Sequence, residues 1–216
     1  MAREATLRKY VEPVETARVP AFGGGEPPAP PRARAPVVSN GRLAILMFIA
    51  AEVMFFAGLI GAFIVFKLAA PLWPPAFQPR LPTEVTGVNT VILLLSGVAM
   101  LLAMGAARRQ EKPRLVRYLS IAALLGAVFL LVQGYEWLRL IGFGLKLSSG
   151  VYGATFYTLI GCHGAHVLGA VSWLGVVLAR AAGGRYDRPS EAVELCGIYW
   201  IFVVALWPAL YALVYL

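Results

Sequence analysis

Five long apolar stretches dominate this sequence and leave few folds open to it. They cover residues 43–66, 85–107, 118–138, 151–179 and 195–216. A helix needs about 20 apolar residues to cross the hydrocarbon core of a bilayer, and each stretch is about that long. Lipid-facing barrel strands alternate apolar and polar residues, which these stretches do not do. The chain is 59% hydrophobic and only 14% charged, so it is predicted to be an all-α membrane protein, a bundle of five transmembrane helices.

The positive charges predict which way this bundle faces. Of the 19 Lys and Arg residues, 15 lie in the first 42 residues or in the connections after the second and fourth stretches. Basic loops stay on the cytoplasmic side, so we expect the N-terminus in the cytoplasm and the C-terminus on the outer, periplasmic side. The first forty residues contain no apolar signal-peptide core, and no cleavable signal is expected. The net charge of +8 is interpreted as topology signal and lipid attraction, not as nucleic-acid binding.

The sequence divides into an arm, residues 1–40, and a transmembrane domain, residues 41–216. The second half of the arm (PAFGGGEPPAPPRARAP) is rich in Pro and Gly and has no apolar periodicity. Such a segment cannot build a core of its own. We expect this cytoplasmic arm to lie along a partner subunit, and contact with the chain's own cytoplasmic loops is the alternative.

Acidic side chains near the membrane are the first candidates for function. Glu52 lies inside the first apolar stretch, with no basic residue within nine positions on either side. A carboxylate in hydrocarbon costs about 2.5 kcal/mol or more, so a hydrogen bond, a lipid head group, a proton path or protonation must compensate. Glu136 is expected to pair with Arg139 one turn later or to reach outward to the interface. Glu194 is expected to face solvent, with Arg185 or Arg188 nearby.

The two histidines, His163 and His166, lie three residues apart in GCHGAHVLGA. That spacing puts them on nearly one face of one helix, so they cannot hold a haem iron from opposite sides. A metal site completed by a Glu from another helix stays open, and hydrogen bonds between helices are the more common role. Cys162 and Cys196 are expected at different depths, too far apart for a disulfide. With no CxxCH motif and no paired CxxC motif in the sequence, the chain is predicted to hold no catalytic residue, metal or other cofactor.

Small residues and one proline indicate how the helices pack. Gly161, Ala165 and Gly169 recur every four residues, and this small-residue stripe would let another helix approach closely. Pro208 removes one backbone hydrogen bond from the last helix and is expected to kink it to fit a neighbour.

Seven fragments, in order along residues 41–216, resemble subunit III of the haem-copper terminal oxidases, in its short five-helix bacterial form. They are AEVMFFAGLIGAFIV, WPP, VNTVILLLSGV, LVQGYEW, SGVYGATFY, GCHGAHVLGA and YWIFVVALWPALY. The resemblance assigns Glu52, Glu136, His163 and His166 to the family's lipid-binding or proton-related positions. It departs from the family where Ile201 and Val204 replace a usual His and Asp, which puts in doubt a polar network through the last helix.

The resemblance also implies a role and partners. Such a subunit carries no haem or copper, packs against catalytic subunit I beside subunits II and IV, and holds phospholipids. It supports proton uptake and stable turnover of a proton-pumping oxygen reductase, fed by cytochrome c or quinol, in the bacterial inner membrane. The alternative is a related accessory subunit of a nitric oxide reductase or of another respiratory supercomplex.

Overall fold

The computed structural model of the chain describes residues 39–75, 81–184 and 190–216. The predicted arm, residues 1–40, lies almost wholly outside these ranges, as do Arg185 and Arg188. What was expected of them therefore stays a prediction.

Five helices account for the apolar stretches. They are α1 (Asn40–Ala69), α2 (Thr83–Arg108), α3 (Lys112–Gly142), α4 (Gly150–Ala182) and α5 (Ser190–Tyr215). All five are long and apolar enough to cross a membrane, and the described residues include no strand. A helix satisfies its own backbone groups, which hydrocarbon requires. The predicted all-α fold with five spans is confirmed.

The helices extend past the apolar stretches into polar sequence. α3 begins at Lys112, with Pro113 in its first turn, although its apolar stretch begins at Tyr118. Proline suits a first helical turn because the amide there has no helical partner. α1 begins after Ser39, whose side-chain oxygen accepts a hydrogen bond from the Arg42 amide at 3.3 Å. Hydropathy alone marks only the part of each helix that lies in hydrocarbon.

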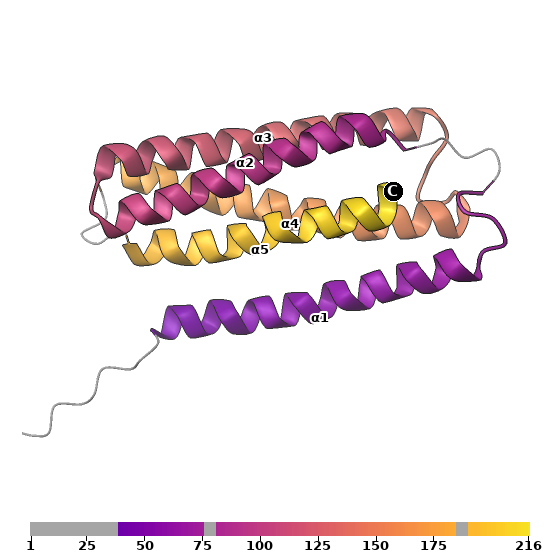
Figure 1. Cartoon of the computed structure of the whole chain (residues 1–216), viewed down its shortest axis with the longest axis horizontal. Coiled ribbons are helices and arrows are strands. Elements are labelled where there is room, and N and C mark those ends of the chain that lie inside the picture. The colour runs from indigo at the N-terminus through magenta and orange to yellow at the C-terminus, as the bar shows by residue number, and fades with distance from the viewer. Residues whose placement is uncertain (1–38, 76–80, 185–189) are drawn as a thin grey trace, which may run out of the picture. The chain divides into compact units, whose positions relative to one another are not determined.

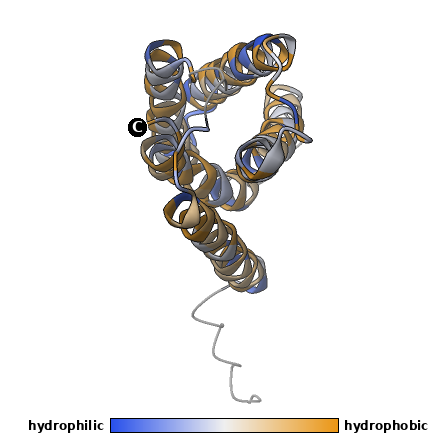
Figure 2. Ribbon diagram, turned by 90° about the vertical axis from the view of Figure 1, so that its right-hand side faces the viewer, coloured by the Kyte–Doolittle hydropathy of each residue, from blue (hydrophilic) through white to orange (hydrophobic). Residues whose placement is uncertain are grey.

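Four of the helices form a ring, and the fifth lies outside it. α2 packs on α3, α3 on α4, α4 on α5, and α5 on α2, while α1 packs on α4 and α5 (Figure 1). Viewed along the helices, α1 lies to one side of the other four (Figure 2). Only three side chains of α1 are buried, Ile45, Phe56 and Phe63.

Large aromatic side chains fill the space between α2, α3, α4 and α5. Trp200 and Trp207 of α5 are 0% and 1% exposed, and Phe129 of α3 packs edge-on against Trp207 at 5.1 Å. Trp200 reaches Gly126 of α3, where an added Cβ would lie 2.4 Å from the indole ring. Gly126 is therefore required by packing across the core.

Hydrogen bonds tie the same helices together. The Asn89 side chain donates to the Phe129 carbonyl at 3.1 Å, which joins α2 to α3. The Trp207 indole N–H donates to the Thr90 hydroxyl at 2.8 Å, which joins α5 to α2. Inter-helix hydrogen bonds of this kind contribute about 0.6 kcal/mol each in membrane proteins. α5 continues as a helix through Pro208, and the kink expected there stays a prediction.

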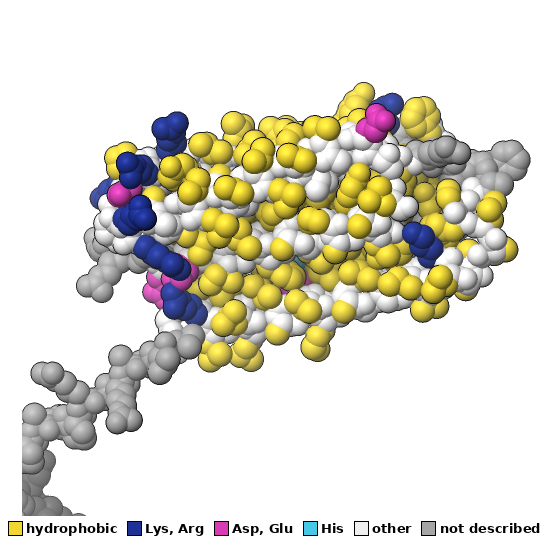
Figure 3. All heavy atoms as spheres, viewed as in Figure 1, with side chains coloured by type: hydrophobic (Ala, Val, Ile, Leu, Met, Phe, Trp, Pro, Cys, Tyr) yellow, Lys and Arg dark blue, Asp and Glu magenta, His cyan; other side chains and the backbone are white. Residues whose placement is uncertain are grey.

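The surface separates charged ends from an apolar middle. In Figure 3 the Lys, Arg, Asp and Glu side chains gather toward two ends of the bundle, most of them where α1 begins, and apolar side chains cover the length between. Exposed Leu, Val, Ile, Met and Phe side chains on α1, α2, α3 and α4 make up much of this middle zone. This is the surface of a multi-pass membrane protein.

Glu194, expected to face solvent, is partly exposed at the first turns of α5. Its side chain is 17% exposed and accepts hydrogen bonds from Arg42 of α1 and, at 3.1 Å, from Arg108 of α2. Both arginines are distant in sequence and arrive through the antiparallel return of the helices. Glu194 thus joins the ends of three helices.

We predict that Gly126→Ala destabilises the protein by about 1–3 kcal/mol, because the rigid Trp200 ring has no room to move. Gly134→Ala on the same helix is the matched control, since no described atom lies within 4 Å of a Cβ placed there. Thermal unfolding in detergent, followed by tryptophan fluorescence, measures both variants. Equal melting temperatures would contradict the close packing of α3 on Trp200.

Candidate functional site

Glu52 of α1 and His166 of α4 contact each other across the helix interface. Glu52 Oε2 lies 2.9 Å from His166 Nε2, and the two side chains are 14% and 22% exposed. Glu52 is near the middle of α1, so the contact lies deep in the span. The fold thus gives the isolated carboxylate a polar partner that is 114 residues away in sequence.

The second ring nitrogen of His166 determines how protons are placed in this pair. Nδ1 lies 2.6 Å from the Cys162 carbonyl oxygen, and a carbonyl only accepts, so Nδ1 carries a hydrogen. Glu52 Oε2 lies opposite Nε2, but it makes no hydrogen bond to any of the described residues. A proton between the two atoms would give the pair zero net charge, which is the form that hydrocarbon tolerates best.

Two aromatic rings lie beside His166. The Phe56 ring, 1% exposed, lies 5.1 Å from the His166 ring, and the Phe55 ring, which is 46% exposed, lies 6.2 Å from it. The buried Phe56 ring lowers the local dielectric, which strengthens polar contacts. The pair can therefore hold one proton, or present it to a polar group that approaches from the exposed side.

His163 lies on the other side of Phe56 and has different neighbours. It is 0% exposed, its ring is stacked on Trp207 at 5.1 Å, and the Phe56 ring is 6.3 Å away. Neither ring nitrogen of His163 has a hydrogen-bond partner among the described residues. The two histidines share one aromatic neighbour but form no common site.

Glu136 forms an ion pair of its own. Its carboxylate accepts a hydrogen bond from Arg139 at 3.1 Å, and the Arg139 guanidinium also lies 5.9 Å from the Tyr135 and Phe143 rings. The predicted pairing with Arg139 is confirmed. In the part of the chain that the structure describes, no hydrogen bond joins Glu136 to either histidine. Of the four candidates, only Glu52 and His166 are brought together.

The small-residue stripe of α4 is largely uncovered. Gly161 is the member nearest another helix, with the Trp137 ring 3.9 Å from an added Cβ. Ala165 and Gly169 are exposed, and no described atom lies within 4 Å of a Cβ at Gly169. A helix packed on this stripe, if there is one, belongs to a partner, and that role stays a prediction.

Cysteine and metal-ligand positions can be stated for the described residues. Cys162 and Cys196 are free thiols. Within residues 39–75, 81–184 and 190–216, no group of three or more His, Cys, Asp and Glu side chains is placed to hold a metal ion. The Glu52–His166 contact involves two residues and belongs to no such group within the described ranges.

The sequence did not predict which residues pack against and orient the two histidine rings. Phe56 packs against both rings, Trp207 stacks on His163, and the Cys162 carbonyl orients His166. The i, i+4 spacing of Cys162 and His166 is the one local signal that could have indicated the Nδ1 bond. The aromatic contacts carry no local signal, because they join separate helices.

Comparison with known proteins identifies the family to which the chain is similar. The family model described as cytochrome c oxidase subunit III matches residues 32–216. The chain is 34% identical over 174 residues to a cytochrome c oxidase subunit 3 of Synechocystis sp., covering 80% of this chain and 73% of that protein. It is 35% identical over 188 residues to that of Osphranter robustus, covering 83% of this chain and 71% of the relative. A subunit 3 of Sus scrofa is 35% identical over 187 residues, covering 83% and 70%.

The match spans all five helices described above and the segments that hold Glu52 and His166. The similarity to proteins from a bacterium and from vertebrates is of the same extent. The chain therefore belongs to the cytochrome c oxidase subunit III family and is a multi-pass membrane accessory subunit of a respiratory oxidase.

Proposed function

We propose that this chain is the non-catalytic subunit III of a proton-pumping oxygen reductase in a bacterial inner membrane. It packs against catalytic subunit I, beside subunits II and IV, and those partners hold the haem and copper. The family match and the bacterial relative support this assignment.

The Glu52–His166 pair is the observation that carries the functional proposal. Its facing atoms are 2.9 Å apart inside the span, close enough to share a proton, and both its side chains remain partly exposed. A pair of this kind supports proton uptake and stable turnover by buffering protons next to the catalytic subunit. A purely structural hydrogen bond between α1 and α4 is the competing role.

Lipid binding is proposed next to the same interface. An apolar cavity of about 250 Å³ lies between α1 and α4, lined by Leu59, Phe63 and Phe66 on one side and Thr158 and Leu159 on the other. It lies two to four helical turns beyond Glu52 along α1. A phospholipid chain fits this apolar groove, and its retention would keep the pair out of contact with bulk water.

Assembly gives the first test of this proposal. Purification of the tagged chain from its native membrane should also recover a haem- and copper-bearing catalytic subunit, detected by optical spectrum and metal analysis. Haem with non-haem iron in the partner would instead favour the nitric oxide reductase alternative. Recovery of the chain without any haem-bearing partner would contradict both.

Glu52→Gln separates proton buffering from structure. The glutamine amide can donate to His166 Nε2, so the α1–α4 bond remains, but no proton can leave it. We predict stability within about 0.5 kcal/mol of wild type and an unchanged haem spectrum, with fewer turnovers before the oxidase inactivates and loss of a protonatable carboxyl band in infrared difference spectra. Glu84→Gln, on an exposed first turn of α2, is the matched control.

Glu52→Ala should behave differently from both variants. It removes side-chain volume and leaves His166 Nε2 without a partner, at a cost of about 1–3 kcal/mol. If Glu52→Gln sustains turnover and keeps its bound lipid as wild type does, while Glu52→Ala is destabilised, the role of Glu52 is structural only.

The proposed orientation can be tested separately. A reporter enzyme that folds only in the periplasm should be active when fused after Leu216 and inactive when fused in the α2–α3 connection, which carries Arg109 and lies just before Lys112 of α3. The reverse pattern would contradict a cytoplasmic N-terminus.

A further inference from the structure

Tyr199 of α5 lies beside the Glu52–His166 pair, at the junction of α1, α4 and α5. Its ring is 5.6 Å from the Phe48 ring of α1 and 6.0 Å from the Trp173 ring of α4. Phe48 precedes Glu52 by four residues, so the two lie on one face of α1, one turn apart. Tyr199 is thus nearer than Glu52 to the end of the bundle where α1 begins, which the proposed orientation places in the cytoplasm.

The direction of helical side chains brings Glu52 toward the level of Tyr199. Side chains on a helix tilt toward its N-terminal end, so the Glu52 carboxylate leans back toward Phe48. Its charge also acts on the Tyr199 hydroxyl, and among the described residues it is the one charged side chain that does so appreciably. The hydroxyl and the carboxylate are therefore electrostatic neighbours, although they belong to different helices.

The Tyr199 hydroxyl is free to take a new partner. Tyr199 is 8% exposed, and its hydroxyl makes no hydrogen bond to another described residue. Unlike Glu52 Oε2, this hydroxyl is not one of the unpaired atoms that are sealed from solvent, and neither is Glu52 Oε1. A hydroxyl both donates and accepts, so it can donate to the carboxylate and accept from water at the same time.

The opposite side of the pair is closed. Phe56, one turn beyond Glu52 on α1, is 1% exposed and packs against both histidine rings. Behind it, His163 is 0% exposed, and its ring nitrogens have no hydrogen-bond partner among the described residues. Phe56 therefore separates the pair from polar groups on that side, while Tyr199 presents a hydroxyl on the other.

Tyr199 also divides the distance between the pair and the charged end of the bundle. Arg42, which pairs with Glu194 at that end, is ten residues before Glu52, or about 15 Å along α1. Tyr199 is five residues beyond Glu194, or about 7.5 Å along α5. A distance too long for one hydrogen bond thus becomes two shorter steps that water molecules can bridge.

We propose that Tyr199 relays protons between the Glu52–His166 pair and the end of the bundle where α1 begins. The Tyr199 O–H bond breaks as its proton passes to a Glu52 carboxylate oxygen. A hydronium ion on the other side of the hydroxyl gives a proton to the phenol oxygen and becomes water, so tyrosine is neutral before and after the step. Loss of a proton from the pair follows the reverse order. This inference rests on the proton-sharing role proposed for the pair, and it adds the side from which the proton arrives.

Hydrogen–deuterium exchange at the pair, in the intact purified complex, tests the relay. The infrared bands that Glu52→Gln removes belong to the Glu52 carboxyl group, as acid or as carboxylate, and their shift in heavy water reports exchange of the shared proton. Tyr199→Phe keeps the ring and removes only the hydroxyl. We expect it to leave these bands unmoved in ordinary water and to slow their exchange by about tenfold or more.

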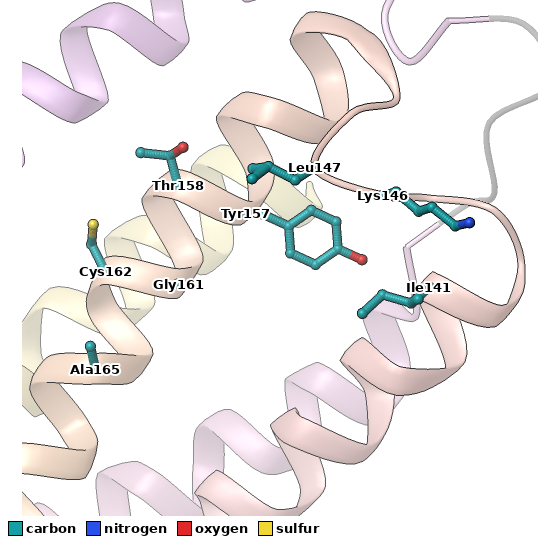
Figure 4. Close-up of a pocket in the computed structure, with 8 residues that line it drawn as sticks. All are labelled: Ile141, Lys146, Leu147, Tyr157, Thr158, Gly161, Cys162 and Ala165. Carbon is teal, nitrogen blue, oxygen red and sulfur yellow. The ribbon is translucent and has the colours of Figure 1, made fainter.

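Tyr157→Phe is the matched control, because it also removes one phenol hydroxyl from the bundle. The Tyr157 hydroxyl donates to the Leu145 carbonyl at 2.7 Å, and Figure 4 shows the ring pointing from α4 toward Ile141 and Lys146. Tyr157 is nine residues before His166, or about 13 Å along α4. Exchange at the pair should stay within about twofold of wild type in this variant.

Tyr199→His gives a second variant with the opposite expectation. An imidazole ring can donate and accept a proton as the phenol does, so exchange should return to within about threefold of wild type. The haem spectrum and subunit composition of each preparation show whether the complex has assembled. Turnover of Glu52→Gln tests the proposed function, so its failure is seen separately from failure of the relay.

Each outcome decides the matter. Slow exchange in Tyr199→Phe, with normal exchange in Tyr157→Phe and recovery in Tyr199→His, supports the relay. Equal exchange in Tyr199→Phe and wild type would overturn it, as would equal slowing by the two phenylalanine variants or bands that do not exchange in wild type. Bands that move in Tyr199→Phe without a change in exchange rate would leave Tyr199 a structural neighbour only.

Discussion

Lipid tails are as apolar as leucine side chains, so there is little hydrophobic driving force for helices to associate in a bilayer. The position of α1 therefore depends on its polar contacts. With only three buried side chains, this helix has a small packing interface of its own. It makes one polar contact with the four-helix ring near each end and one near its middle. These contacts are Arg42 with Glu194, Glu52 with His166, and Lys67 with the Leu213 carbonyl at 3.0 Å. The candidate functional pair is thus also the central polar attachment of α1, so a substitution at Glu52 must keep this contact if it is to test the proton alone.

The packing of α2, α3, α4 and α5 on one another depends instead on bulky side chains that pack against glycines. Trp200 fills the space that Gly126 leaves, and Val204 lies 3.1 Å from a Cβ added at Gly97 of α2. Val204 and Ile201, where the family resemblance leads one to expect Asp and His, face Gly97 in this chain. The polar links of α5 lie further toward its end, through Trp207, Tyr211 and Tyr215.

The sequence could predict interactions between residues that are close together along the chain, but not those between distant residues. Five helices follow from apolar length, and the Glu136–Arg139 pair follows from an i, i+3 spacing, because both are local. The partner of Glu52 could not be predicted, since His166 reaches it only when α4 returns beside α1. The partners of Glu194 within the described residues have the same origin: Arg42 and Arg108 are distant in sequence and are brought to it by the fold. Local charge spacing predicts pairs within one helix and fails for pairs between helices.

The two histidines show how far three residues can separate two functions. A step of three residues turns about 300° around a helix, so His163 and His166 point about 60° apart. That angle is enough for His166 to meet Glu52 at the lipid edge, while His163 stacks on Trp207 inside the bundle. Phe56 packs against both rings and keeps the proton of the Glu52 pair apart from the unpaired nitrogens of His163. Among the described residues, no hydrogen bond therefore joins the Glu52–His166 pair to His163, although the two histidines are less than one turn apart on α4.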